Sequence, residues 1–97
     1  MIAFTAPLWL WNGEGGSWHF ITVSEEASAA TSQEAAAAGP RQGFGSVRVE
    51  ARIGMVRWRT SVFPQKSSGY ILPVKAEVRR NAGIATGDEV SVELELL

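Results

Sequence analysis

Residues 89–96 read Glu-Val-Ser-Val-Glu-Leu-Glu-Leu, an unbroken alternation of polar and apolar side chains. Because successive side chains of a β-strand point to opposite faces, this pattern predicts a strand with one buried and one solvated face. The turn residues Thr86-Gly87-Asp88 come just before it, where an aspartate can bond its own backbone. Such a strand needs partners, and the rest of the chain supplies them.

Partner strands are indicated by further runs of alternating or β-branched and aromatic residues. These runs lie at residues 4–11, 18–23, 46–62 and 70–72. The run at 46–62 is long enough for a hairpin, with Gly54 at its turn. Pro7 has no backbone N–H, so we expect the first strand to lie at a sheet edge or to be bulged there.

Two helices are expected between these strands. Ser24 is a good N-cap for a helix over Ala27–Ala38, whose alanines favour helix but offer little apolar surface, so we expect weak docking. Residues 39–43 should end this helix in a loop. A short helix over Lys75–Ala82 should end at Gly83 in a left-handed cap. The fold class is therefore mainly β: a small single-domain β-barrel of about six strands, with one alanine-rich helix and one short helix before the last strand.

Composition excludes several kinds of chemistry. The 97 residues suffice for one domain, and the absence of cysteine removes disulfides, thiol nucleophiles and zinc ribbons. One histidine, His19, is too few for a usual zinc site, and no phosphate-loop or dinucleotide motif occurs, so we expect neither metal nor cofactor. The N-terminus lacks the basic residues of a secretory signal and no run is long enough to cross a membrane. We therefore expect a cytoplasmic protein without a membrane partner.

Charged residues cluster on the predicted hairpin, where one face carries Arg48, Arg52, Arg57 and Arg59. Guanidinium groups can grip an anion, but they can equally pair with glutamates on neighbouring strands. We favour pairing for Arg48 and Arg52 and leave Arg59 open. The net charge is −1, and residues 45–97 carry eight basic against six acidic residues, which argues against a nucleic-acid partner.

Tryptophan is abundant for a chain of this length. Trp18 and Trp58 are expected in the core, whereas Trp9 and Trp11 share a face with Thr5 and Pro7. One of these two could therefore be exposed and mark an interface, or stack on a ligand or base.

A candidate ligand site is indicated around one loop and the start of the second helix, a loop that also carries Ser67 and Ser68. We expect these residues to ring a polar mouth on the barrel: Arg59, Ser61, Lys66, Tyr70, Lys75 and Arg79. Lys75 adds weight, because a cation at a helix N-terminus is unfavourable and suggests another role.

A family resemblance is carried by motifs spread over almost the whole chain. The motifs are Trp9-x-Trp11, Trp18-His19-Phe20, Val-Arg-Val-Glu-Ala-x-Ile-Gly at 47–54, Trp-Arg-Thr-Ser-Val-Phe-Pro at 58–64, Tyr-x-Leu-Pro-Val-Lys-x-x-Val-Arg at 70–79, and Gly-Asp-x-Val at 87–90. Together they resemble the bacterial domain of unknown function DUF1905. The resemblance implies a single DUF1905-like β-barrel domain over residues 1–97 and leaves the function open.

The last third of the chain has a second, shorter resemblance. Residues 70–73, Val78-Arg79, residues 82–84 and residues 87–90 are similar to the half-barrel of AbrB-type DNA-binding proteins, which are swapped dimers.

The sequence favours a non-enzymatic binding module as the function. Its partner would be an anionic small molecule or a protein, bound at the polar mouth by Arg59, Lys66 and Lys75. The alternatives are an AbrB-like dimeric DNA-binding protein and a small enzyme using Lys75 or Ser61 as a nucleophile. A monomer and a homodimer are both compatible with the sequence.

Overall fold

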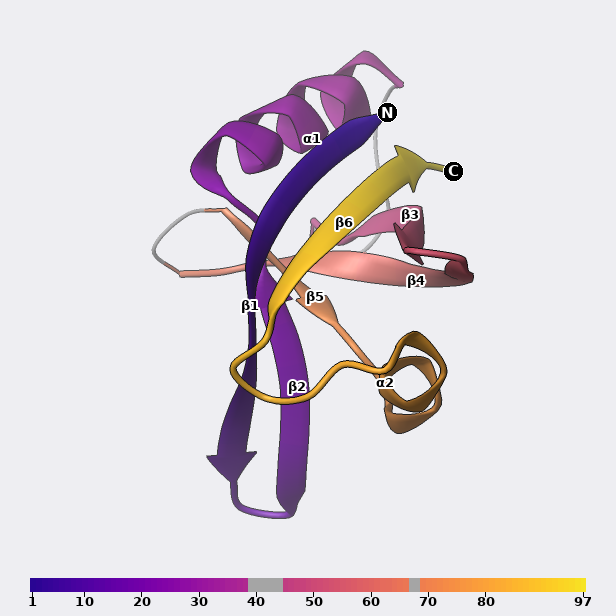
Figure 1. The fold of residues 1–97 in the computed structure, drawn as a ribbon. Helices are drawn as coiled ribbons and strands as arrows, with labels where there is room; N and C mark the ends of the chain where they lie inside the picture. Colours follow the sequence, from indigo (N-terminus) through magenta and orange to yellow (C-terminus); the bar gives the residue numbers. More distant parts are fainter. Residues whose placement is uncertain (39–44, 67–68) are drawn as a thin grey trace.

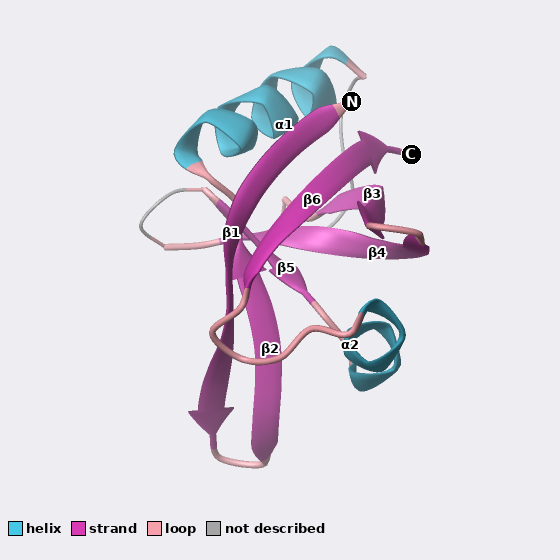
Figure 2. Cartoon of the chain, in the orientation of Figure 1, coloured by secondary structure: helices cyan, strands magenta, loops and turns pink. Residues whose placement is uncertain are grey.

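The structure is a computed structural model that describes residues 1–38, 45–66 and 69–97, and these residues form six strands and two helices (Figures 1 and 2). The elements in chain order are β1 Ile2–Gly13, β2 Gly16–Thr22, α1 Glu25–Ala37, β3 Val47–Ile53, β4 Val56–Pro64, β5 Tyr70–Pro73, α2 Ala76–Ala82 and β6 Glu89–Leu96. The predicted mainly-β class is thereby confirmed. The loop expected over residues 39–43 lies outside the described residues, as do Ser67 and Ser68.

The strands close into one antiparallel barrel in the order β1-β2-β5-β4-β3-β6. Closure depends on the length of β1, because residues 2–7 pair with β6 whereas residues 8–13 pair with β2. Pro7 stands at this change of partner, and the next hydrogen bond toward β6 comes from the Leu8 amide, which donates to Asp88 O over 2.9 Å. The first strand is therefore not an edge strand, so the edge alternative is wrong. The register with β6 runs without a break from Ile2–Leu94 to Pro7–Glu89, so no bulge interrupts it there either.

The barrel interior is filled mainly by aliphatic side chains, which alternate with outward-facing residues most regularly on β3 and β6. Its most deeply buried members include Leu8, Ile21, Val49, Val62, Leu72 and Leu94. Among the described residues, the aromatic members of the core are Phe4 and Tyr70, and Trp58 packs against it while half-buried. The alternation predicted for residues 89–96 is confirmed, since Val90, Val92 and Leu94 are buried.

Helix α1 lies across one end of the barrel (Figure 1). The predicted cap is present, since Ser24 Oγ accepts a hydrogen bond of 3.2 Å from the Ala27 amide. Ser28 Oγ donates to Val23 O and accepts from the Tyr70 amide, each over 3.2 Å. Because its buried residues are alanine, serine and threonine, α1 is attached by small contacts and these hydrogen bonds rather than by large apolar side chains.

Helix α2 sits near the opposite end and contacts β4 (Figure 1). Its predicted cap is confirmed: Gly83 has φ 67°, a left-handed conformation that glycine adopts freely. The Ile84 amide then donates to Arg79 O over 3.1 Å, and the Ile84 side chain packs against the core. In the described part of the chain, neither helix has the length and apolar character needed to cross a membrane.

The β1–β2 hairpin projects beyond the barrel, away from α1 (Figure 1). Its register pairs Trp11 with Trp18 and closes on Gly13 opposite Gly16. Side chains on this projection have no barrel interior beneath them, and Trp18 is 58% exposed and Leu10 40% exposed. The expectation that Trp18 lies in the core is therefore wrong.

Candidate functional site

Two of the expected polar-mouth residues lie on the outward side of β4. Arg59 Nε is 3.9 Å from Glu50 Oε1 on β3. Ser61 Oγ accepts a long hydrogen bond of 3.5 Å from Arg48 Nη1, also on β3. Both residues thus make contacts between neighbouring strands.

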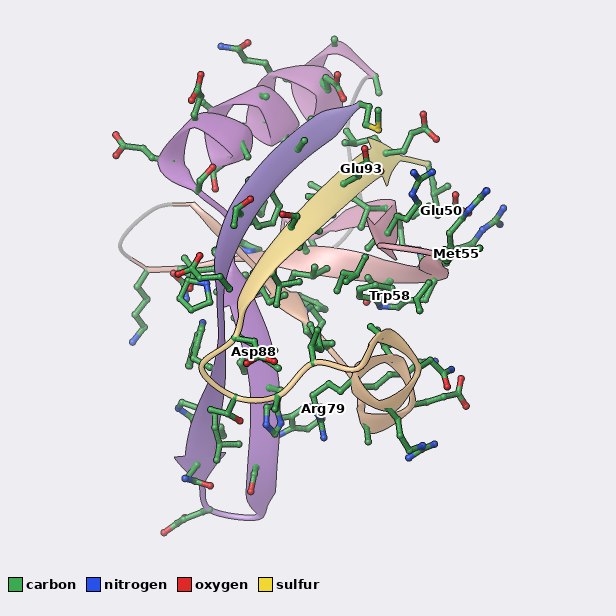
Figure 3. All side chains as sticks on the ribbon, viewed as in Figure 1. Glu50, Met55, Trp58, Arg79, Asp88 and Glu93 are labelled. Atoms are coloured by element: carbon green, nitrogen blue, oxygen red, sulfur yellow. The ribbon has the colours of Figure 1, made fainter. Side chains whose placement is uncertain are left out.

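The other four expected residues lie elsewhere. Lys66 is exposed in the β4–β5 connection, and Tyr70 is buried at the start of β5. Lys75 precedes α2 at the other end of β5 and is exposed. Arg79 Nη1 donates to Val74 O over 2.7 Å, and Figure 3 shows its side chain between α2 and β2. The structure therefore distributes the six residues over separate places and does not assemble them into one ring.

Among the described residues, two ion pairs lie on the arginine-rich face of the β3–β4 hairpin. Arg52 Nε lies 3.0 Å from Glu93 Oε1 on β6, and the Arg59–Glu50 pair described above is the second; Figure 3 labels both glutamates. Arg57 is opposite Arg52 in the register. Such pairs between partly exposed side chains are worth about 0.2–1 kcal/mol each. The pairing predicted for Arg52 is confirmed, and Arg59, which the sequence left open, lies near Glu50. The pairing predicted for Arg48 is wrong, because within the described ranges its guanidinium donates to Ser61 Oγ and not to a glutamate.

His19 lies on β2 and contacts the segment between α2 and β6. Its Nε2 lies 3.0 Å from Thr86 Oγ1. Desolvation by burial, and secondarily the positive charge of Arg79, lower the pKa of His19 below its ordinary value of 6.5. Both effects favour the neutral imidazole. Among the described residues, no group of three His, Asp or Glu side chains is placed to hold a metal ion.

A different surface stands out on the outward side of β1, β2, β5 and β4. We call it the aromatic face and define it by Trp9, Trp11, Trp18, Phe20, Thr60, Phe63, Gln65, Ile71 and Pro73, which line a groove of about 710 Å³. This volume is within the range of sites that bind small ligands or short segments of protein. Every residue of this described lining is uncharged.

The strand register orders these side chains in rows across the sheet. Trp11 faces Trp18 in the first row, and Trp9 faces Phe20, which in turn faces Pro73, in the second. Ile71 faces Phe63 in the third. Neighbouring rows are two residues apart along a strand and are therefore separated by about 7 Å. Across the sheet, the distance from β1 over β2 and β5 to β4 is about 14 Å. The aromatic face is therefore a ribbed surface and not a deep pocket.

Local contacts hold two of the rings in place. Trp9 Nε1–H donates to Thr22 Oγ1 over 2.9 Å, and the Trp9 and Phe20 ring centroids are 5.3 Å apart at 39°. Trp11 lies along its own strand over Gly13, where a Cβ atom would overlap the indole. Glycine at position 13 thus leaves room for the Trp11 ring to lie flat.

Part of the aromatic face was visible in the sequence and part was not. Trp11, 46% exposed, confirms that one of the first two tryptophans is exposed. The sequence alone does not indicate Phe20 or Phe63, and its prediction of Trp18 in the core is wrong. The alternation of side chains along a strand could have placed Trp18 correctly. Trp18 and Phe20 are two residues apart on β2, so both point to the outward side, and His19 between them points to the other side.

Comparison with models of known protein families gives a match to one family. The model of DUF1905, described as a domain of unknown function, matches residues 4–94, nearly the whole chain. A search of curated proteins found no match.

Proposed function

The chain belongs to the DUF1905 family, a domain of unknown function, and we propose that it is a binding module whose ligand lies on the aromatic face. No catalytic step is part of the proposal. A reducing compartment such as the cytoplasm is part of it, because the sequence has no cysteine.

The observation that carries this proposal is the distribution of the aromatic residues. Five of the nine in the sequence, namely Trp9, Trp11, Trp18, Phe20 and Phe63, line the outward groove. Large rings contribute most to stability when they are buried, yet Trp11, Trp18 and Phe63 are between 45% and 58% exposed. A contiguous apolar surface left in water is typical of an interaction site.

The polar-mouth alternative is less well supported by the geometry. Arg59 faces Glu50, and Lys66 and Lys75 lie at opposite ends of β5. Nor does the geometry favour the enzyme alternative. A nucleophile needs a base within hydrogen-bond reach, whereas Ser61 lies on β4 and Lys75 at the start of α2. The DNA-binding alternative would depend on arginines that are free to contact phosphates. Arg52 and Arg59 each lie near a glutamate instead, Glu93 and Glu50 respectively.

A thermal-shift screen with matched variants tests the proposal. Anionic metabolites, nucleotides, duplex DNA, neutral oligosaccharides and neutral peptides are tested separately at low salt. A ligand present at about 100 times its Kd adds about 2.7 kcal/mol, which raises Tm by about 10 °C or more in a domain of this size.

The variants locate the bound ligand. We expect the double variant Trp11→Ala, Trp18→Ala to lose the stabilisation, whereas Arg59→Ala keeps it. Met55→Ala is the matched control, because Met55 is a 99% exposed apolar side chain on the other hairpin. A rise in Tm that survives the double variant and disappears in Arg59→Ala would contradict the proposal. An unchanged Tm with every ligand tested would contradict it as well.

A further inference from the structure

The aromatic face disfavours an anionic ligand. Its described lining contains aromatic and aliphatic side chains with Thr60 and Gln65, and no Lys, Arg, Asp or Glu. A phosphate or carboxylate ligand needs positive charge against it, since such recognition is made by Arg and Lys. A ligand that fits this groove therefore carries no phosphate or carboxylate where it makes contact.

The polar groups on the aromatic face are suited to a ligand that accepts hydrogen bonds. Trp11 and Trp18 each carry an indole N–H, which can only donate. Gln65 can donate as well, through its amide NH₂. A chain of prolines has carbonyl acceptors and no backbone N–H, so its hydrogen-bonding needs match these donors.

The position of the aromatic residues also limits how a peptide can bind. They project from the outward side of the sheet, so a segment lying on them meets side chains and not the free backbone groups of a strand edge. Its own backbone must then stay hydrated, as it does in the polyproline II helix. This helix rises about 3.1 Å per residue, so four or five residues span the face of about 14 Å.

We propose that the occupant of the aromatic face is a neutral proline-rich segment of a partner protein in the polyproline II conformation. This inference rests on the function proposed above. Proline rings would pack on the three rows of the aromatic face, from Trp11 and Trp18 to Ile71 and Phe63. Aromatic-lined grooves are a recurring way of recognising such segments, because the ligand loses little entropy on binding.

Titration with a capped oligoproline peptide of about ten residues tests this inference. Binding is followed by isothermal calorimetry and by tryptophan fluorescence, with a capped Gly-Ser peptide of the same length as the control ligand. We expect saturable binding of oligoproline and none of the Gly-Ser peptide. Trp18→Ala should weaken binding by about tenfold or more, as for an aromatic residue central to an interface.

Gly13→Ala gives a sharper variant, because it keeps every aromatic ring and displaces only Trp11. It should weaken oligoproline binding, whereas Met55→Ala should leave it unchanged. Circular dichroism confirms that each variant is folded.

The outcomes separate this inference from the proposed function. If a neutral oligosaccharide or a nucleotide binds in a Trp18-dependent way and oligoproline does not, the proline inference is wrong and the proposed function stands. If oligoproline binds equally to wild type and Trp18→Ala, the placement on the aromatic face is wrong. If no ligand binds in a Trp18-dependent way, both are wrong.

Discussion

Trp18→Ala and Leu72→Ala should destabilise the protein in the opposite order to the size of the side chain removed. Leu72 is fully buried in the barrel, whereas Trp18 lies on the outward side of the hairpin and is 58% exposed to solvent. Burying a whole large apolar side chain is worth about 3 kcal/mol, so the buried two-fifths of Trp18 contribute about 1 kcal/mol. Leucine-to-alanine changes in a core cost about 2–5 kcal/mol, because a cavity is left.

Urea denaturation followed by circular dichroism measures both losses without relying on the tryptophan signal. Thermal denaturation followed by the same signal gives Tm. At about 4–8 °C per kcal/mol, Trp18→Ala should lower Tm by less than about 10 °C, and Leu72→Ala by clearly more. The slope of the free energy of unfolding against urea should stay constant, which shows that the unfolding reaction is the same. A loss for Trp18→Ala equal to or larger than that for Leu72→Ala would refute our placement of Trp18 outside the core.

Three further predictions test other parts of the structure. Gly83→Ala should cost about 1 kcal/mol in urea denaturation, because alanine is strained at φ 67°, and an unchanged midpoint would contradict the left-handed cap. An NMR titration of His19 should have its midpoint below 6.5, since burial first and Arg79 second lower its pKa, and Arg79→Gln should move the midpoint partly back. Because the folded pKa is depressed, the His19 contribution to stability is present above pH 6.5 and is lost as pH falls toward the folded value, a loss that His19→Gln should remove. A double-mutant cycle on Arg52 and Glu93 should give a coupling of about 0.2–1 kcal/mol that fades with salt, and a coupling independent of salt would contradict a partly exposed pair.

Much of the fold could be predicted because local signals agreed with the global structure. The alternation at residues 89–96 needs no knowledge of partners to indicate which side is buried. The caps at Ser24 and Gly83 depend on a few neighbouring residues, and both are present. The role of Pro7 could not be predicted in this way, because the change of partner along β1 depends on how the barrel closes.

The candidate site was harder to predict because it depends on register between strands. Lys66 and Lys75 are close in sequence, but β5 runs between them and carries them to opposite ends. Trp18 was assigned to the core from the general tendency of tryptophan, whereas its alternation with His19 places it outside. The groove appears only when the β1–β2 hairpin is aligned with β5 and β4, which brings Phe63 beside residues that lie far away in the chain.

An NMR titration of the four tryptophan indole N–H signals with oligoproline tests the central claim most directly. Trp11 and Trp18 lie on the aromatic face, whereas Trp58 packs against the core between β4 and α2 (Figure 3). Our account predicts that the Trp11 and Trp18 signals shift in a saturable way while the Trp58 signal stays in place. Unmoved Trp11 and Trp18 signals, with shifts instead at the backbone amides of Arg59 and Lys75, would contradict it and return the binding site to the polar residues.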